Sequence, residues 1–276
     1  MLSSYQESIA IFLGINVLMA FSVYVPTSAG LISLGQAGFM AIGAYASAYL
    51  TSRYTSFDVP FALALFLGGA AAGAVGVLVA APAVRIKGIY LIIATLGFGE
   101  IVRVLFVNFE PLGGASGLSG IKPLTTLSWV VAICLFFFAF LWRLRSTPLG
   151  RAFVAIHEDE TAAEAMGINL FRTKLMAFGG GAFIAGIAGG LYAHFALFID
   201  PSQFAFSKSA EAFLFVILGG SVNPLGPVAG AIVVTLLPEF LRFLQDWRMS
   251  FFAVLLIACA VWRPGGLISY RRAAHP

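Results

Sequence analysis

The longest hydrophilic stretch of the chain, residues 143–175, contains residue types and spacings that suit work at a protein surface. Its central part, RAFVAIHEDETAAEAMG, combines strong helix formers with acids, and Gly167 before Ile168 and Asn169 is typical of a helix C-terminus. Alanines and Met166 leave a flat, mildly apolar face, and we expect four acids to stay in water: Glu158, Asp159, Glu160 and Glu164. Such a helix suits docking into a groove on another protein. The alternative is a helix that only lies on the membrane surface.

Patterns for catalysis or metal binding are missing from the sequence. It contains no GxxxxGK[ST] loop for ATP, no HExxH zinc motif and no GxSxG nucleophile elbow. His157 has no second imidazole one helical turn away, and Cys134 and Cys259 lie in apolar runs, where a free cysteine behaves as a small hydrophobe. We therefore expect no catalytic residue, no metal site and no cofactor bound by this chain itself.

The elements that position this segment must be membrane helices. Of the 276 residues, 60% are hydrophobic and 10% are charged, whereas a soluble domain has about 45–50% apolar and about 25% charged residues. This composition excludes a soluble enzyme, a disordered tail and a disulfide-rich secreted domain. It predicts an all-α, polytopic integral membrane protein that forms a single domain over residues 1–276.

A transmembrane helix needs about 20 mostly apolar residues. On that criterion we expect about nine spans, with a range of eight to ten, near 9–25, 30–50, 61–82, 88–107, 127–142, 176–197, 209–220, 226–241 and 249–262. The seventh and eighth flank the break GGSVNPLGP, whose prolines cannot continue a helix. They are either two short spans or a broken, re-entrant hairpin.

Lysines and arginines indicate the sidedness, because cytoplasmic loops carry an excess of them. With residues 143–175 in the cytoplasm, that side holds ten cations: Arg85, Lys87, Arg143, Arg145, Arg151, Arg172, Lys174, Arg263, Arg271 and Arg272. The opposite side holds five: Arg53, Lys122, Lys208, Arg242 and Arg248. The bias places the C-terminus inside, and nine spans then place the N-terminus outside.

Few charged groups lie inside the expected spans. Ser33, Gln36, Thr95 and Glu100 are the candidates for lining a path across the membrane, with hydrogen bonding between helices as the alternative. Glu100 and Arg103 have the spacing of a pair on one helical face. The other charged groups, Glu211 among them, are expected near span ends. Glycines crowd the third and sixth spans, which predicts close helix packing.

Six blocks of the sequence resemble one family, and they occur in that family's order. TAAEAMG (161–167) resembles the EAA signature of bacterial ABC importer permeases, with Thr161 where the signature has Glu. The six blocks, one of which contains this signature, are GLISLGQAGFMAIGAYASA (30–48), RIKGIYLIIATLGFGEIVR (85–103), GGASGLSGI (113–121), STPLGRAFVAIHEDETAAEAMGIN (146–169), LGGSVNPLGPVAGA (218–231) and WRPGGLI (262–268). Together they resemble the LivM-type permease subunits of bacterial branched-chain amino acid ABC importers.

This resemblance implies a permease without its own ATPase site in a bacterial inner membrane. Its partners would be a second, homologous permease subunit, two cytoplasmic ATPase subunits that bind ATP, and a periplasmic substrate-binding protein, with membrane lipid around it and no nucleic acid. The residues implied in ATPase coupling, around a helix near 158–167, are Gly150, Arg151, Glu158, Asp159, Glu160, Ala162, Ala163 and Gly167.

Three alternatives stay open from the sequence. An ion-gradient-driven secondary transporter would also be polytopic, but it predicts internal repeats and an ionisable group at mid-membrane. An ABC permease for urea or short amides has a closely similar pattern. A membrane scaffold without transport needs no path at all.

Overall fold

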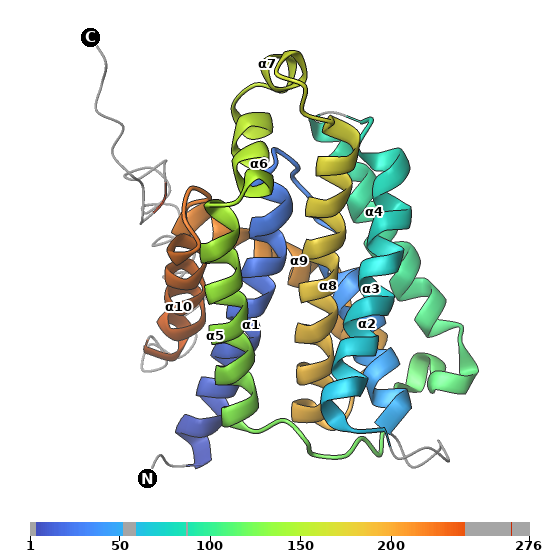
Figure 1. Cartoon of the computed structure of the whole chain (residues 1–276). Helices are drawn as coiled ribbons and strands as arrows, with labels where there is room; N and C mark the ends of the chain where they lie inside the picture. The colour runs from blue at the N-terminus through green and yellow to red at the C-terminus, as the bar shows by residue number, and fades with distance from the viewer. Residues whose placement is uncertain (1–3, 52–58, 87, 241–265, 267–276) are drawn as a thin grey trace.

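A computed structural model describes residues 4–51, 59–86, 88–240 and 266, and these residues form helices joined by short connections (Figure 1). The α-helices are α1 (Ser4–Ser28), α2 (Gln36–Thr51), α3 (Phe61–Ala83), α4 (Ile89–Val107), α5 (Leu127–Arg145), α6 (Pro148–Glu158), α7 (Glu160–Ala165), α8 (Leu170–Ala196), α9 (Phe206–Gly219) and α10 (Leu225–Phe240). Short 3-10 helices cover Glu110–Leu112, Gly114–Ser116 and Pro201–Phe204. The predicted all-α class is confirmed.

Five of these helices, α1, α3, α4, α5 and α8, are long and apolar enough to cross a membrane. The helices α2, α9 and α10, with 16, 14 and 16 residues, are shorter than the spans expected there. The expected span at 249–262 lies outside the described residues. The structure thus establishes a polytopic helical bundle and leaves the number of spans near nine as a prediction.

Residues 29–35 differ from the sequence prediction of a span over 30–50. They are not helical, and α2 begins only at Gln36. Gly30 has a φ of 76°, a conformation that glycine adopts readily and that stops α1 from continuing. The Leu34 amide donates to Thr95 Oγ1 (3.1 Å), six residues past the start of α4. We call this segment the 29–35 connection. Six residues of α4 correspond to about 9 Å along the helix axis at 1.5 Å per residue, so the connection reaches that far into the bundle beside α4.

Helix α8 is the centre of the bundle, because α1, α2 and α3 all pack against it. Its glycines let neighbouring backbones come unusually close. A Cβ on Gly43 of α2 would lie 2.1 Å from the carbonyl oxygen of Gly186, and one on Gly186 would lie 2.9 Å from the Cα of Gly69 in α3. The predicted close packing of glycine-rich spans is therefore confirmed.

Helices α9 and α10 form a hairpin that packs against α1. Its break lies at the end of the bundle that carries α6, since Arg145 Nη1 donates to Asn223 Oδ1 (2.9 Å) at the end of α5. Ser221 and Val222 line one small cavity together with Gly150 and His157. The break thus lies on the face of residues 143–175, which is the face expected to be cytoplasmic, with Val222 exposed there.

The contact between α2 and α8 gives a direct test of this packing. We expect Gly43→Val to lower the melting temperature of the purified protein sharply, because a Cβ there overlaps backbone and overpacking alone costs about 1–3 kcal/mol. Gly97→Ala is the matched control, since nothing lies within 4 Å of a Cβ at that helical position. Equal melting curves for the two variants, measured by size-exclusion chromatography after heating, would contradict the packing.

Candidate functional site

Residues 148–165 form two helices where the sequence predicted one. Helix α6 starts at Pro148, and its N-cap Thr147 accepts a hydrogen bond from the Gly150 amide (3.3 Å). Asp159 then has extended φ and ψ of −157° and 113°, and its Oδ1 accepts from the amides of Thr161 (2.8 Å) and Ala162 (3.1 Å). The expectation of a continuous helix is wrong because the Asp159 side chain caps α7, and aspartate is favoured at N-caps over helix interiors.

Three of the predicted coupling residues belong to α6. Gly150 is buried, and a Cβ there would lie 2.1 Å from the carbonyl oxygen of Leu144, so this glycine allows α6 to fold tightly against the end of α5. Arg151 is exposed, and its Nη1 donates to the carbonyl oxygen of Ser146 (2.9 Å). Glu158 is exposed at the last position of α6.

The α7 residues do not all face outward as expected. Glu160 Oε1 accepts from Lys174 Nζ (2.6 Å), and the Lys174 side chain is only 4% exposed, so this acid holds α7 to α8. Ala163 is 3% exposed and faces its own chain, which corrects its place on an outward face. Ala162 is exposed, and Met166, at 84%, is the most exposed large hydrophobic side chain described.

Gly167 ends α7 as predicted. Its φ is 82°, its amide donates to the carbonyl oxygen of Glu164 (2.9 Å), and the next amide, of Ile168, donates to that of Ala163 (3.1 Å). This pair of bonds is the Schellman arrangement, which requires a left-handed residue at this position. The chain then turns into α8, whose first turn is capped by Asn169 Oδ1 accepting from the Arg172 amide (2.9 Å).

The inner face of α6 seats this segment on the membrane bundle. Phe153 and Ile156 are buried, and α6 packs on the ends of α1, α5 and α8. A Cβ on Gly30 would lie 3.5 Å from the Cα of His157, so the backbone of α6 lies against the start of the 29–35 connection. The main chain of α6 therefore comes close to the connection that leads into the bundle.

Three of the four predicted pathway residues come together at the start of α2. Thr95 Oγ1 accepts from the Leu34 amide (3.1 Å), and Ser33 Oγ accepts from the Gly35 amide (3.3 Å). Gln36 is fully buried, and neither atom of its side-chain amide has a hydrogen-bond partner. An unpartnered buried amide is costly. Ser33, Gln36 and Thr95 therefore form a polar cluster with hydrogen-bonding capacity to spare.

One further serine, which the sequence analysis did not select, lies beside this cluster. Ser209 Oγ, in the first turn of α9, accepts from the Ala37 amide (2.9 Å) in the first turn of α2. The N-terminal turns of two short helices therefore meet inside the bundle. No local sequence signal marks Ser209, because its partner is 172 residues away.

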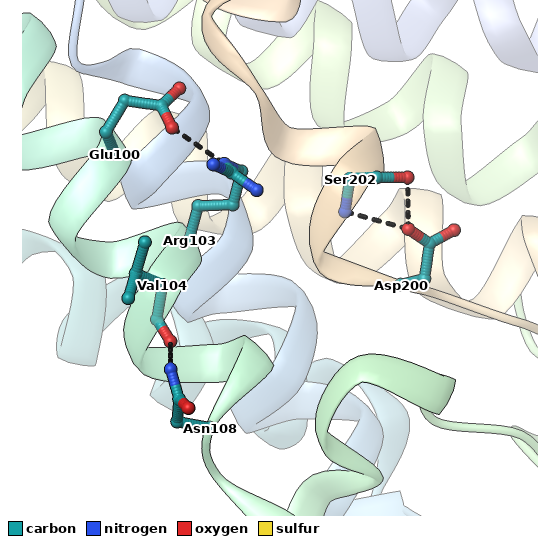
Figure 2. A network of polar contacts seen from close by, with 6 residues as sticks. All are labelled: Glu100, Arg103, Val104, Asn108, Asp200 and Ser202. Carbon is teal, nitrogen blue, oxygen red and sulfur yellow. Dashed lines mark hydrogen bonds and ion pairs between the residues drawn. The ribbon is translucent and has the colours of Figure 1, made fainter.

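Glu100, the fourth predicted pathway residue, forms the expected pair on one face of α4 (Figure 2). Its Oε2 accepts from Arg103 Nε at 2.7 Å, and the two side chains are 35% and 33% exposed. Its burial differs from that of Thr95, which is 1% exposed. The structure therefore does not bring Glu100 into the buried polar cluster.

The expectation for Lys208 and Glu211 is wrong. Lys208 was expected in an outer loop, but it belongs to α9, and its Nζ donates to Asn16 Oδ1 (3.1 Å) and to Glu211 Oε2 (2.8 Å). Asn16 is the central residue of the 25-residue α1, and its Nδ2 donates to Thr235 Oγ1 (3.0 Å) in α10. An ion pair thus lies half-way along a membrane-spanning helix. Sequence reasoning missed it because α9 starts inside the bundle rather than at its edge.

Metal ligands do not gather among the described residues, where no group of three or more His, Cys, Asp or Glu could hold an ion. Of the two cysteines, Cys134 Sγ donates to the Gly14 carbonyl oxygen (3.3 Å) between α5 and α1, and Cys259 lies outside the described residues. The polar chemistry of the bundle is therefore hydrogen bonding and charge pairing.

Comparison with known proteins identifies relatives over most of the chain. The family described as "Branched-chain amino acid transport system / permease component" matches residues 5–260. The chain is 34% identical to the high-affinity branched-chain amino acid transport system permease protein LivM of Escherichia coli K12, over 94% of this chain and 67% of that protein. It is 28% identical to a probable LivM of Methanocaldococcus jannaschii, over 75% and 67% of the two chains.

A more distant relative has a different name. The chain is 24% identical to the ribose import permease protein RbsC of Escherichia coli K12, over 83% of this chain and 73% of that protein. No solved structure matches the chain. Similarity to permeases with different named substrates shows a shared transport architecture more securely than a shared substrate.

The Asp159 cap can be tested on its own. We expect Asp159→Ala to speed amide hydrogen exchange at Thr161 and Ala162 and to destabilise α7 by about 1 kcal/mol, because both amides lose their acceptor. Asp159→Asn, which keeps a capping oxygen, should exchange at nearly the original rate. If Asp159→Ala leaves exchange in α7 unchanged, the two-helix description of this segment is wrong.

Proposed function

This chain belongs to the permease components of branched-chain amino acid transport systems, and we propose that it carries branched-chain or related small amino acids across a bacterial inner membrane. As a multi-pass permease of the ABC importer type, it has a transport role within an assembly. Membership of that class implies ATPase and substrate-binding partners. The proposal adds a second, homologous permease as the other half of a heterodimer, two ATPase subunits and a periplasmic binding protein.

The segment α6–α7 carries the proposal. It extends beyond the long helices of the bundle and is held by a helix cap at Thr147, a second at Asp159, a Schellman end at Gly167 and an ion pair from Glu160 to Lys174. Rigid capping at both ends suits an element that transmits force, because a loose loop would absorb it. We assign Ala162, Met166, Arg151 and Glu158 to the ATPase-facing surface, and Gly150, Asp159, Glu160, Ala163 and Gly167 to its support.

A route from this surface into the bundle follows from the packing. Helix α6 touches Gly30, and the 29–35 connection leads from Gly30 to the polar cluster of Ser33, Gln36 and Thr95. A displacement of α6 driven by ATPase closure would therefore reach the start of α2 over seven residues of backbone. Non-helical backbone at this depth is tolerated only where protein or water satisfies it, as along transport paths. We propose that this cluster lines part of the path.

The rival secondary transporter has one feature in its favour. The Lys208–Glu211 pair half-way along α1 is the kind of mid-membrane charge that such a transporter predicts. The family of the chain favours the ATP-driven importer instead. The two mechanisms differ in their energy source, and that difference decides the experiment.

The function is tested by reconstitution of the complete importer in vesicles. We expect uptake of radiolabelled leucine to need ATP and the loaded binding protein, and to persist when an ionophore dissipates ion gradients. Uptake of urea or ribose in place of leucine would refute the substrate assignment. Leucine uptake that ignores ATP but collapses with the ionophore would refute the ATP-driven mechanism.

The exposed face of α7 gives a prediction for coupling. We expect Ala162→Trp to abolish co-purification of the ATPase subunits while the permease keeps its melting temperature, because Ala162 is exposed and bulk there blocks only a partner. Ala163→Trp is the matched contrast: Ala163 is 3% exposed, so that variant should also lower the melting temperature. Wild-type uptake and normal ATPase binding in Ala162→Trp would remove this face from the coupling surface.

The buried amide of Gln36 gives a prediction in which stability and transport move in opposite directions. We expect Gln36→Met to raise stability by about 1–3 kcal/mol, because it removes an unpartnered buried polar group at little change of shape. Transport should fall, because the path loses its hydrogen-bonding group. Melting curves and leucine uptake of the same preparation measure both. Unchanged uptake in the stabilised variant would show that Gln36 lies off the path.

A further inference from the structure

Helices α1 and α10 pack against each other (Figure 1 labels both), and a groove is lined by residues of these two helices and of α9. It has a volume of about 350 Å³, within the range of about 300–1,000 Å³ that is usual for small-molecule sites. Its walls are mixed in character: Ile9, Phe12 and Val234 are apolar, whereas Thr235, Glu211 and Glu239 are polar. The groove can therefore offer both charge and apolar surface to one small ligand.

Lys208 lies behind the wall of this groove, against two of the residues that line it, Glu211 and Phe12. Its ammonium contacts the Glu211 carboxylate and the Asn16 side chain, and it lies 5.1 Å from the centre of the Phe12 ring. Glu211 and Phe12 both line the groove, and the Lys208 side chain is 14% exposed. Two of its three N–H donors have oxygen partners, and the ring of Phe12 faces the charge. The cation is thus separated from the groove only by its own partners, Glu211 and Phe12.

The depth of Lys208 is the unusual feature. It contacts the central residue of α1, so the charge lies far from both membrane surfaces. Charged groups at this depth are expensive, and those retained usually mark a substrate or ion path. Its neighbours extend the arrangement, since Asn16 also bonds Thr235 of α10 and thereby joins three helices around one cation.

We infer that Lys208 binds the carboxylate of the transported amino acid in this groove, while Glu211 takes its ammonium group. The inference rests on the proposed function. An amino acid is a zwitterion, so it can replace the internal Lys208–Glu211 ion pair by two ion pairs, one between Lys208 and its carboxylate and one between Glu211 and its ammonium group. Each charge therefore keeps an opposite charge beside it throughout the exchange. The aliphatic side chain of the substrate then packs on Ile9, Phe12 and Val234.

The site implies a selectivity for zwitterions. Urea, amides and sugars have neither a carboxylate nor an ammonium group, and none of them can replace both halves of the ion pair. The apolar cavity of about 550 Å³ between α5 and α8, lined by Phe136, Phe140 and Phe183 among others, offers no charged side chain to a zwitterion. The groove of α1, α9 and α10 is therefore the place where an α-amino acid is told from a neutral solute.

The first test compares variants in the complete reconstituted importer. We expect Lys208→Met to lower the rate of leucine uptake about tenfold to a hundredfold, the usual effect of losing one charge-assisted hydrogen bond. Lys208→Arg should retain most of the uptake. ATPase stimulation by the loaded binding protein should stay within about twofold of the original in both, since coupling is untouched. Arg103→Met, which breaks a pair of the same spacing on α4, is the matched control and should leave uptake unchanged.

The second test does not depend on any change at Lys208. Ser8 is exposed and lines the groove, so Ser8→Cys should react with a maleimide. Leucine should slow that reaction in the assembled importer, whereas leucinol, which has no carboxylate, should not. In a Lys208→Met background the protection by leucine should disappear.

These outcomes separate the site from the function. If the importer takes up leucine but leucine and leucinol protect Ser8→Cys equally, Lys208 is only a structural cation and the inference is wrong. The same holds if Lys208→Met imports leucine at the original rate. If the unaltered importer takes up no leucine, the proposed function itself fails. If Lys208→Met does not assemble, the comparison of leucine with leucinol on Ser8→Cys still decides whether the groove binds the carboxylate.

Discussion

The close approach of backbones at α8 is the constraint on which the other features depend. Lipid tails are as apolar as leucine side chains, so no hydrophobic force drives helices together within a bilayer, and packing must do so instead. Contacts such as Gly43 on Gly186 and Gly186 on Gly69 bring α2 and α3 against α8 at distances that no larger residue allows. Helices α4 and α5, by contrast, are mostly exposed and reach the centre only in part.

That rigid centre makes irregular backbone possible inside the bundle. Unpaired amides in the 29–35 connection would be prohibitive in lipid. Its first three amides, of residues 29 to 31, donate to carbonyl oxygens at the end of α1. Side chains serve amides further along: Thr95 accepts from Leu34 and Ser33 from Gly35, and Ser209 accepts from Ala37 in the first turn of α2. Each acceptor has to be held in place, and α4 and α9 hold Thr95 and Ser209. The polar cluster is thus a product of the packing around it, and Gln36 is the member left without a partner.

Much of the architecture could be predicted from composition and local pattern. The helical class, the glycine packing, the Glu100–Arg103 pair and the left-handed end at Gly167 all depend on residues within a few positions of one another. The errors have a different origin. Asp159 looks like one acid in a helical run, and only its carboxylate bond to Thr161 shows that it starts a new helix. Lys208 looks like a loop cation, because its partner Asn16 is 192 residues away. Long-range polar contacts of this kind leave no periodic trace in a sequence.

The contact between Gly30 and His157 has a mechanical consequence. A Cβ on Gly30 would lie 3.5 Å from the Cα of His157, so the main chain of the outer segment lies close to the connection, with no side chain of residue 30 between them. A linkage made of long side chains has slack, because each rotamer change lets one end move while the other stays still. Here no side-chain rotation can absorb a tilt of α6. Even a sub-ångström shift of α6 therefore displaces the 29–35 connection, which leads to α2. The absence of a side chain at position 30 is what allows α6 and the 29–35 connection to lie this close together.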